Sequence, residues 1–181
     1  MGPFARPLIV IGLLLSFVLK GKAQVPAQVL PAFSFLGAGK QAFTNKDLAQ
    51  DRPLFFLFVD PDCEHCQRAV HTIGENHAAF RNAAMYVISL DSREKLSSFM
   101  DKYGGALNGQ KNVLLLQDNL NQFIVRFKPR RYPAMMLYSP KGQLIDYEDN
   151  PESVFRIVNQ LKLGTSRPRS GTNPPPKPGT K

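Results

Sequence analysis

Apolar and polar residues follow one another in blocks along the chain, and these blocks predict strands separated by helices. Residues 54–59 (LFFLFV) are all apolar, which is typical of a central strand that is covered on both faces. Shorter apolar blocks at 85–90, 113–116 and 133–138 predict further strands. Since stretches with apolar residues at helical spacing separate these strands, the pattern indicates an α/β domain.

The stretches between and after these strands predict four helices, at 63–80, 91–103, 118–127 and 150–163. Asp91 and Glu94 stand in the positions of a capping box at the start of the second helix. Asp118 or Asn119 can cap the third helix, and Gly164 is expected to end the last one.

A hairpin is expected at each end of the domain. Residues 32–36 and 40–43 flank a glycine-rich turn and predict an N-terminal hairpin, which is followed by a short helix over 44–50. Residues 133–138 and 143–147 flank a Pro-Lys-Gly turn and predict the second hairpin.

The first 23 residues have the pattern of a secretory signal peptide. Arg6 precedes the 12-residue apolar run Leu8–Leu19, and small residues stand near a cleavage point after Ala23. An uncleaved membrane anchor is the alternative, although 12 apolar residues are fewer than the ~20 that span a bilayer. With residues 1–23 as a signal peptide, the sequence predicts export to the periplasm or the extracellular space.

The net charge of +9 lies mostly at the two ends of the chain. All 14 acidic residues lie in 24–163 with 16 of the 23 basic residues, so this segment carries a net charge of only +2. A domain so close to neutrality lacks the excess of positive charge that binds a nucleic-acid backbone, which excludes nucleic-acid binding. Residues 164–181 are basic and Pro-rich without a large apolar side chain, which predicts a disordered tail after one folded domain over 24–163.

The chain has two cysteines, Cys63 and Cys66, in a Cys-Glu-His-Cys sequence at the start of a predicted helix. A disulfide-bonded scaffold needs more cysteines at wider spacing, and a bond closing so short a loop adds little stability. The pair therefore points to redox chemistry through a reversible Cys63–Cys66 disulfide. Since a helix N-terminus favours a thiolate, Cys63 is expected to be the exposed attacking group. Cys66, one turn further on, is expected to be the buried thiol that resolves the mixed disulfide.

The two residues between the cysteines are expected to tune the reactivity of the pair. A protonated His65 stabilises a thiolate at Cys63, whereas Glu64, with Asp60 and Asp62 near it, repels one. Because the two effects have opposite signs, neither the reduction potential nor the direction of electron flow follows from the sequence.

A Cys-x-x-Cys pair is also half of a typical zinc site, and His71 and His77 follow it. No His or Cys follows His77, and the two histidines point in different directions on the predicted helix. We therefore expect no metal and no organic cofactor, because the cysteines themselves carry the electrons.

In chain order, three features resemble the thioredoxin superfamily: the apolar strand LFFLFV, the sequence DPDCEHC at a helix start, and a later Arg-Tyr-Pro before an apolar strand. The resemblance is strongest to the exported TlpA-like (redoxin) branch and covers residues 31–163. It implies a thioredoxin-like α/β fold, in which helices flank a central mixed β-sheet that an N-terminal β-hairpin extends. It also implies that Pro133 is a cis-proline facing the dithiol and that Tyr132 contacts the substrate. The implied function is thiol–disulfide exchange with exported protein substrates, with a further redox partner upstream.

The chain departs from the family pattern around the dithiol. Asp62 replaces the usual Trp, and the central strand lacks the buried carboxylate that many thioredoxins use for proton transfer, so Glu64 or a water is expected to serve instead. Asp60 stands three residues before Cys63, where peroxiredoxin chemistry needs Thr or Ser, which argues against a peroxidase. The alternative from another class is a thioredoxin-like binding module or a metal-handling protein without redox turnover.

Overall fold

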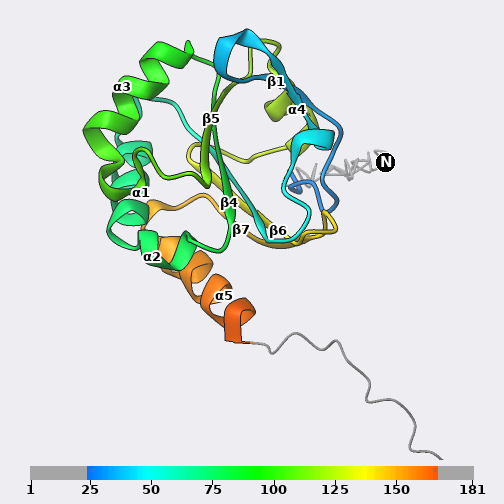
Figure 1. The fold of residues 1–181 in the computed structure, drawn as a ribbon, viewed down its shortest axis with the longest axis vertical. Coiled ribbons are helices and arrows are strands. Elements are labelled where there is room, and N and C mark those ends of the chain that lie inside the picture. The colour runs from blue at the N-terminus through cyan, green and yellow to red at the C-terminus, as the bar shows by residue number, and fades with distance from the viewer. Residues whose placement is uncertain (1–23, 167–181) are drawn as a thin grey trace, which may run out of the picture.

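The computed structural model describes residues 24–166, which form a seven-stranded mixed β-sheet flanked by helices (Figure 1). The predicted signal peptide, residues 1–23, and residues 167–181 of the predicted tail lie outside the described residues. The predicted fold class is confirmed, including the N-terminal hairpin of two antiparallel strands.

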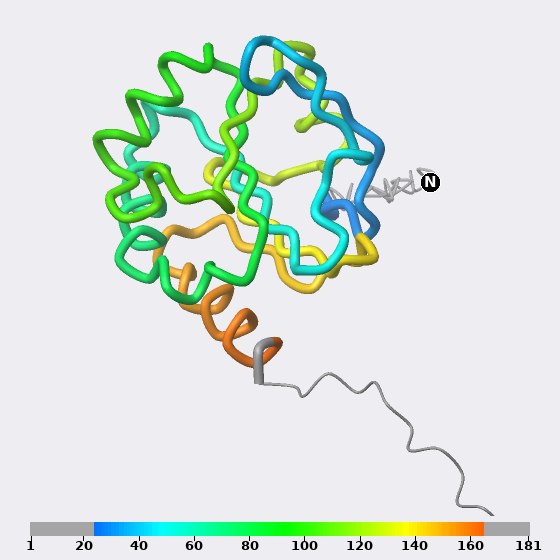
Figure 2. Tube along the Cα trace, in the orientation of Figure 1, coloured from blue at the N-terminus to red at the C-terminus, as the bar shows by residue number. Residues whose placement is uncertain are grey.

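The strands of the sheet are β1 (Ser34–Leu36), β2 (Ala42–Thr44), β3 (Leu54–Phe58), β4 (Ala84–Ser89), β5 (Val113–Gln117), β6 (Ala134–Tyr138) and β7 (Leu144–Glu148). The helices are α1 (Glu64–Glu75), α2 (His77–Phe80), α3 (Arg93–Tyr103), α4 (Gln122–Phe127) and α5 (Val154–Ser166). The first described residues (blue) and the end of α5 (orange) lie on different sides of the domain (Figure 2).

The sheet has the strand order β2-β1-β5-β4-β3-β6-β7. Strands β3, β4 and β5 are parallel, while β6 runs antiparallel to β3, and β7 runs antiparallel to β6. Because parallel strands end at the same edge of a sheet, the carboxyl ends of β3, β4 and β5 meet at one edge, where β6 begins. The two cysteines follow β3, so they lie at this edge.

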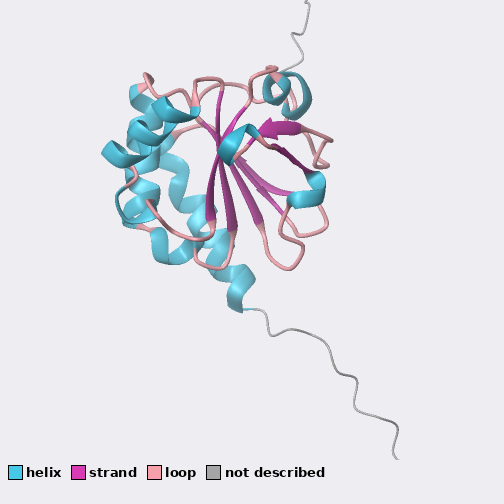
Figure 3. Ribbon diagram, turned by 45° about the horizontal axis from the view of Figure 1, so that its top comes forward, coloured by secondary structure: helices cyan, strands magenta, loops and turns pink. Residues whose placement is uncertain are grey.

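The all-apolar strand β3 is buried along its whole length because helices cover both faces of the sheet (Figure 3). Phe55 and Leu57 pack in a cluster with apolar residues of α1, α3 and α5. Phe56 and Phe58 point to the opposite face, where the ring of Phe123 in α4 stacks on Phe58 with a centroid distance of 4.3 Å. Burial of each such side chain stabilises the fold by about 1.5–3 kcal/mol. The two-sided burial predicted from the sequence is confirmed.

The predicted helix over 63–80 is interrupted at Asn76, which separates α1 from α2. The backbone N–H of Asn76 donates to the carbonyls of Thr72 and Ile73, and its side chain donates to Thr72 (2.9 Å). These bonds satisfy the last carbonyls of α1 and end the helix. The prediction of one continuous helix was wrong at this point.

The start of α3 differs from the predicted capping box of Asp91 and Glu94. Ser92 is the N-cap, and its hydroxyl accepts a hydrogen bond from the backbone N–H of Lys95 (3.2 Å). The cap therefore lies one residue later than predicted, because Ser is as good an N-cap as Asp.

Helix α4 starts at Gln122, later than the predicted 118, and its N-cap position is Asn121, whose side chain makes no capping hydrogen bond. The Asp118 side chain is buried, and its carboxylate accepts the backbone N–H groups of Gln122 (2.9 Å) and Phe123 (2.7 Å). Asp118 thus accepts the first N–H groups of the helix, but it does so from before the N-cap, so the predicted N-cap at Asp118 or Asn119 was wrong.

Two further boundaries were wrong. The predicted helix over 44–50 is only a 3₁₀ turn, Asn45–Asp47, which Thr44 caps. Helix α5 continues through Gly164 to Ser166, beyond its predicted end at Leu163. Gly164 does not take the left-handed conformation with which a glycine ends a helix, and the helix passes through it.

Gly74 lies where α1 touches the chain that follows α3. A Cβ atom at Gly74 would lie 2.6 Å from the carbonyl oxygen of Gly104, and a backbone atom cannot move aside as a side chain can. We expect Gly74→Ala to lower the free energy of unfolding by about 2 kcal/mol, the usual effect of overpacking. Urea unfolding monitored by circular dichroism measures it.

Gly164→Ala is the matched control, because it adds the same methyl group within a helix where nothing lies within 4 Å. This substitution should raise the free energy of unfolding by about 0.5 kcal/mol, since alanine favours helix. If Gly74→Ala raises the free energy of unfolding as much as Gly164→Ala does, the close approach of α1 to Gly104 is contradicted.

Candidate active site

The loop after β3 places Cys63 at the N-cap of α1. The backbone N–H of Cys63 donates to the carbonyl of Asp60 (3.1 Å), and the N–H of Asp62 donates to the Asp60 carboxylate (2.9 Å), which closes a tight turn. Cys63 is half-buried and its backbone is extended (φ −84°, ψ 116°). Its carbonyl accepts the N–H of Gln67 (3.1 Å). The Cys63 thiol is therefore partly accessible and lies at the positive end of the helix dipole.

Cys66 is fully buried in the first turn of α1. The backbone N–H of Asp60 donates to its sulfur (3.4 Å). Burial raises the pKa of the Cys66 thiol far above its ordinary value; the Asp60 N–H lowers this pKa, while Cys63 and the Asp60 carboxylate raise it. Both cysteines are free thiols. Cys63 is thus the accessible sulfur of the pair, and Cys66 is the enclosed one.

Tyr132 and Pro133 lie at the start of β6, beside the end of β3. The Tyr132–Pro133 peptide bond is cis, as the resemblance implied. The ring of Tyr132 stacks on Phe58 with a centroid distance of 4.8 Å. Burial raises the pKa of Tyr132 to about 12, and the charges of Asp60 and Cys66 add to this effect. The structure therefore brings Tyr132 to the dithiol, from a position far away in the sequence.

A cavity of about 210 Å³ opens next to these groups. Asp60, Asp91, Ser89 and Tyr132 line it with polar atoms, together with Val59 and Leu90. Asp60 contacts Cys66 through its backbone N–H and lines this cavity, and its negative charge raises the pKa of the Cys66 thiol. From the sequence, Asp60 was expected to act as a charge near Cys63 and to exclude a peroxide site, but no contact with Cys66 was predicted. Its position directly after a buried strand was the available signal.

Lys95 in α3 binds the loop that carries Cys63. Its ammonium group donates to the carboxylates of Asp62 (2.7 Å) and Asp91 (3.0 Å), and these two acids raise the pKa of Lys95. Asp62 is exposed and Lys95 is only half-buried, so the contact orients the loop more than it stabilises the fold. Sequence reasoning missed this lysine because 33 residues separate it from Asp62.

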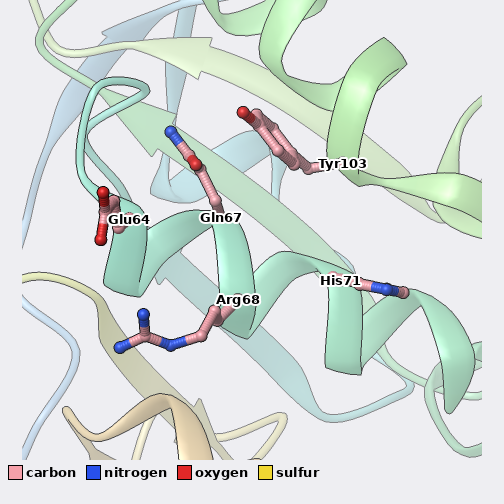
Figure 4. A pocket seen from close by; sticks show the side chains of 5 residues that line it. All are labelled: Glu64, Gln67, Arg68, His71 and Tyr103. Atoms are coloured by element: carbon pink, nitrogen blue, oxygen red, sulfur yellow. The ribbon is translucent and has the colours of Figure 1, made fainter.

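Glu64 and His65 are exposed on the first turn of α1, between the two cysteines. Glu64 lines a groove of about 300 Å³ with Gln67, Arg68, His71 and Tyr103 (Figure 4). The structure thus gives Glu64 a solvent-exposed position, unlike Asp60, which contacts Cys66. The tuning roles of Glu64 and His65 stay predictions.

Within residues 24–166, no group of three or more His, Cys, Asp or Glu side chains is placed to hold a metal ion. Over the same range, no helix combines the length and the apolar composition needed to cross a membrane.

A family model supports the resemblance found in the sequence. The model of the AhpC/TSA family matches residues 26–148, which is more than half of the chain. The chain belongs to the AhpC/TSA family. As an AhpC/TSA protein with a thioredoxin-like fold, it is an oxidoreductase of the redoxin type. No curated protein matches the sequence at a significant level.

The fold of this AhpC/TSA protein is similar to that of several solved structures. The thioredoxin domain of a thiol-disulfide oxidoreductase from Bacteroides vulgatus is 17% identical, with a TM-score of 0.59, and the match covers 76% of this chain and 97% of that one. A secreted disulfide oxidoreductase from Mycobacterium tuberculosis is 20% identical, with a TM-score of 0.55 and coverages of 72% and 95%. A thiol peroxidase from Chromobacterium violaceum is 17% identical, with a TM-score of 0.61 and coverages of 78% and 87%. At these identities the likeness establishes the fold alone.

Proposed function

We propose that this AhpC/TSA protein is a thiol–disulfide oxidoreductase that exchanges disulfides with protein substrates through Cys63 and Cys66. The observation that carries this proposal is the asymmetry of the pair. Cys63 is partly accessible at a helix N-terminus, and Cys66 is enclosed one turn further on. One sulfur can reach a partner, while the other can reach only the first sulfur.

The exchange follows from this arrangement. The Cys63 thiolate attacks a substrate disulfide, which forms a mixed disulfide and releases one substrate thiolate. The Cys66 thiolate then attacks the sulfur of Cys63, which forms the Cys63–Cys66 disulfide and releases the second substrate thiolate. Two electrons pass from the protein to the substrate, and an upstream dithiol partner restores the reduced pair. The same steps in reverse oxidise a substrate dithiol.

The second step requires Cys66 to lose its proton, and we propose that the Asp60 carboxylate accepts it. Burial raises the pKa of the Cys66 thiol, so without an acceptor the thiolate is rare at neutral pH. Asp60 contacts Cys66 through its backbone, and Asp60 and Tyr132 both line the cavity beside it. The proton can leave through this cavity once the new disulfide has formed.

Tyr132 and Pro133 complete the proposed substrate groove at the same edge of the sheet. Export is part of the proposal, because residues 1–23 have the composition of a signal peptide. One structure with a similar fold is described as a secreted disulfide oxidoreductase. The proposed substrates are therefore exported proteins that carry thiols or disulfides.

A comparison of two oxidants tests this function against a peroxidase. The reduced protein is mixed with a small protein disulfide or with hydrogen peroxide, and the loss of its thiols is followed. We expect the protein disulfide to react at least about 100-fold faster, because Asp60 stands where a peroxide site needs a hydroxyl. A faster reaction with peroxide would make the protein a peroxidase, and no reaction with either would make it a binding module.

A further inference from the structure

A second concave site lies at the edge of the sheet opposite the dithiol. This pocket has a volume of about 530 Å³. It is lined by Arg52, Arg81, Gly109, Gln110, Lys111 and Asn112. These residues come from three segments, which precede β3, β4 and β5 respectively. Since the three strands are parallel, their amino ends share the edge that lies farthest from Cys63.

Hydrogen bonds hold the three segments of this pocket in place. The side chain of Asn112 donates to the carbonyls of Phe80 and Ala83 (2.9 Å each), which joins the segment of Lys111 to the segment of Arg81. The backbone N–H of Ala84 donates to the carbonyl of Pro53 (2.9 Å), which joins the segment of Arg52 to the same chain. The backbone positions from which the three cationic side chains extend are therefore fixed by the fold.

The charges of the pocket are not balanced within it. Arg52 forms a bidentate pair with Asp51 (2.8 and 2.9 Å). Neither Arg81 nor Lys111 forms an ion pair with any residue in the range 24–166, and both side chains are exposed. Cations that share one pocket repel one another, so an anion that enters it relieves this repulsion and gains charge-assisted hydrogen bonds.

We propose that this pocket binds a small, multiply charged phosphate-type anion, with Arg81 and Lys111 as its main ligands and Arg52 at its border. Its lining contains no aromatic or aliphatic side chain, so the ligand is hydrophilic and needs no base-stacking surface. Gly109, which also lines the pocket, has a φ of +72°, and a Cβ atom there would meet nothing within 4 Å. The site is separate from the dithiol and does not depend on the proposed redox function.

Isothermal titration calorimetry with inorganic pyrophosphate, at constant ionic strength, tests the proposal. We expect saturable binding to the wild-type protein and at least about tenfold weaker binding to the double variant Arg81→Ala/Lys111→Ala. The control is Lys46→Ala/Lys141→Ala, which removes the same charge from two exposed positions elsewhere and should bind as the wild type does. Equal binding to all three proteins, or no saturable binding to the wild type, overturns the proposal.

Thermal unfolding without ligand shows that both double variants are folded, and pyrophosphate should raise the unfolding temperature of the wild type and the control only. A vesicle experiment distinguishes a free anion from a lipid headgroup. If the natural ligand is a headgroup, vesicles that contain phosphatidic acid bind the wild type, and pyrophosphate displaces the protein. If it is a free anion, only pyrophosphate binds. Vesicle binding that the Arg81→Ala/Lys111→Ala variant retains in full counts against the pocket.

Discussion

Cys63→Ser is expected to slow the reduction of a protein disulfide by about a thousandfold or more, because a hydroxyl at this position is not a nucleophile toward sulfur. Cys63 is the partly accessible sulfur of the pair, and the buried Cys66 cannot reach a protein substrate in its place. The rate is measured with the variant and the wild-type protein at equal concentration against a small protein disulfide. The unfolding midpoint of the variant shows whether the fold is retained.

Cys66→Ser is the matched substitution and should give a different result. The first attack by Cys63 still occurs, but the mixed disulfide is not resolved, so a covalent complex with the substrate accumulates and can be separated by non-reducing electrophoresis. If instead Cys63→Ser accumulates the covalent complex, the roles of the two cysteines are reversed. If neither variant affects exchange, the proposed function is wrong.

Most of the fold could be predicted from the sequence because its central strands are short, continuous blocks of apolar residues, which are typical of buried strands. The all-apolar run of β3 indicated a strand covered on both faces, and the structure shows two separate apolar clusters on its two sides. Helix boundaries were predicted less well. Asn76 ends α1 with its own side chain, and Ser92 takes the cap in place of Asp91. Such choices depend on local hydrogen bonds between residues with nearly equal propensities.

The positions of the two cysteines and Pro133 could also be predicted, because spacing and resemblance both point to them. The roles of Asp60 and Lys95 could not. Lys95 reaches Asp62 only when α3 packs beside α1, and no local pattern describes that contact. Proton transfer was expected from Glu64 or a water, because Glu64 is the carboxylate between the two cysteines in the sequence. Asp60, whose backbone N–H contacts the buried thiol, lies just before the helix.

Asp60→Asn is expected to slow the second step of exchange, the closure of the Cys63–Cys66 disulfide, by about a hundredfold at neutral pH. Asparagine keeps the backbone N–H that reaches the sulfur of Cys66 and an oxygen for the N–H of Asp62, so the turn stays intact. Only the ability to accept a proton is lost. Stopped-flow measurement of the release of a substrate thiol from the mixed disulfide follows this step.

The direction of the change distinguishes proton transfer from a simple charge effect. The negative charge of Asp60 raises the pKa of the Cys66 thiol, so its removal lowers that pKa and, by itself, would speed the closure. A slower closure in Asp60→Asn therefore requires that Asp60 accept the proton.

The rate of the Asp60→Asn variant should recover as the pH rises, because hydroxide then takes the proton. Glu75→Gln removes the same charge from an exposed carboxylate at the other end of α1, and it should leave the closure within about twofold of the wild-type rate. A faster closure in Asp60→Asn would show that Asp60 acts only as a charge, and the acceptor would then have to be water.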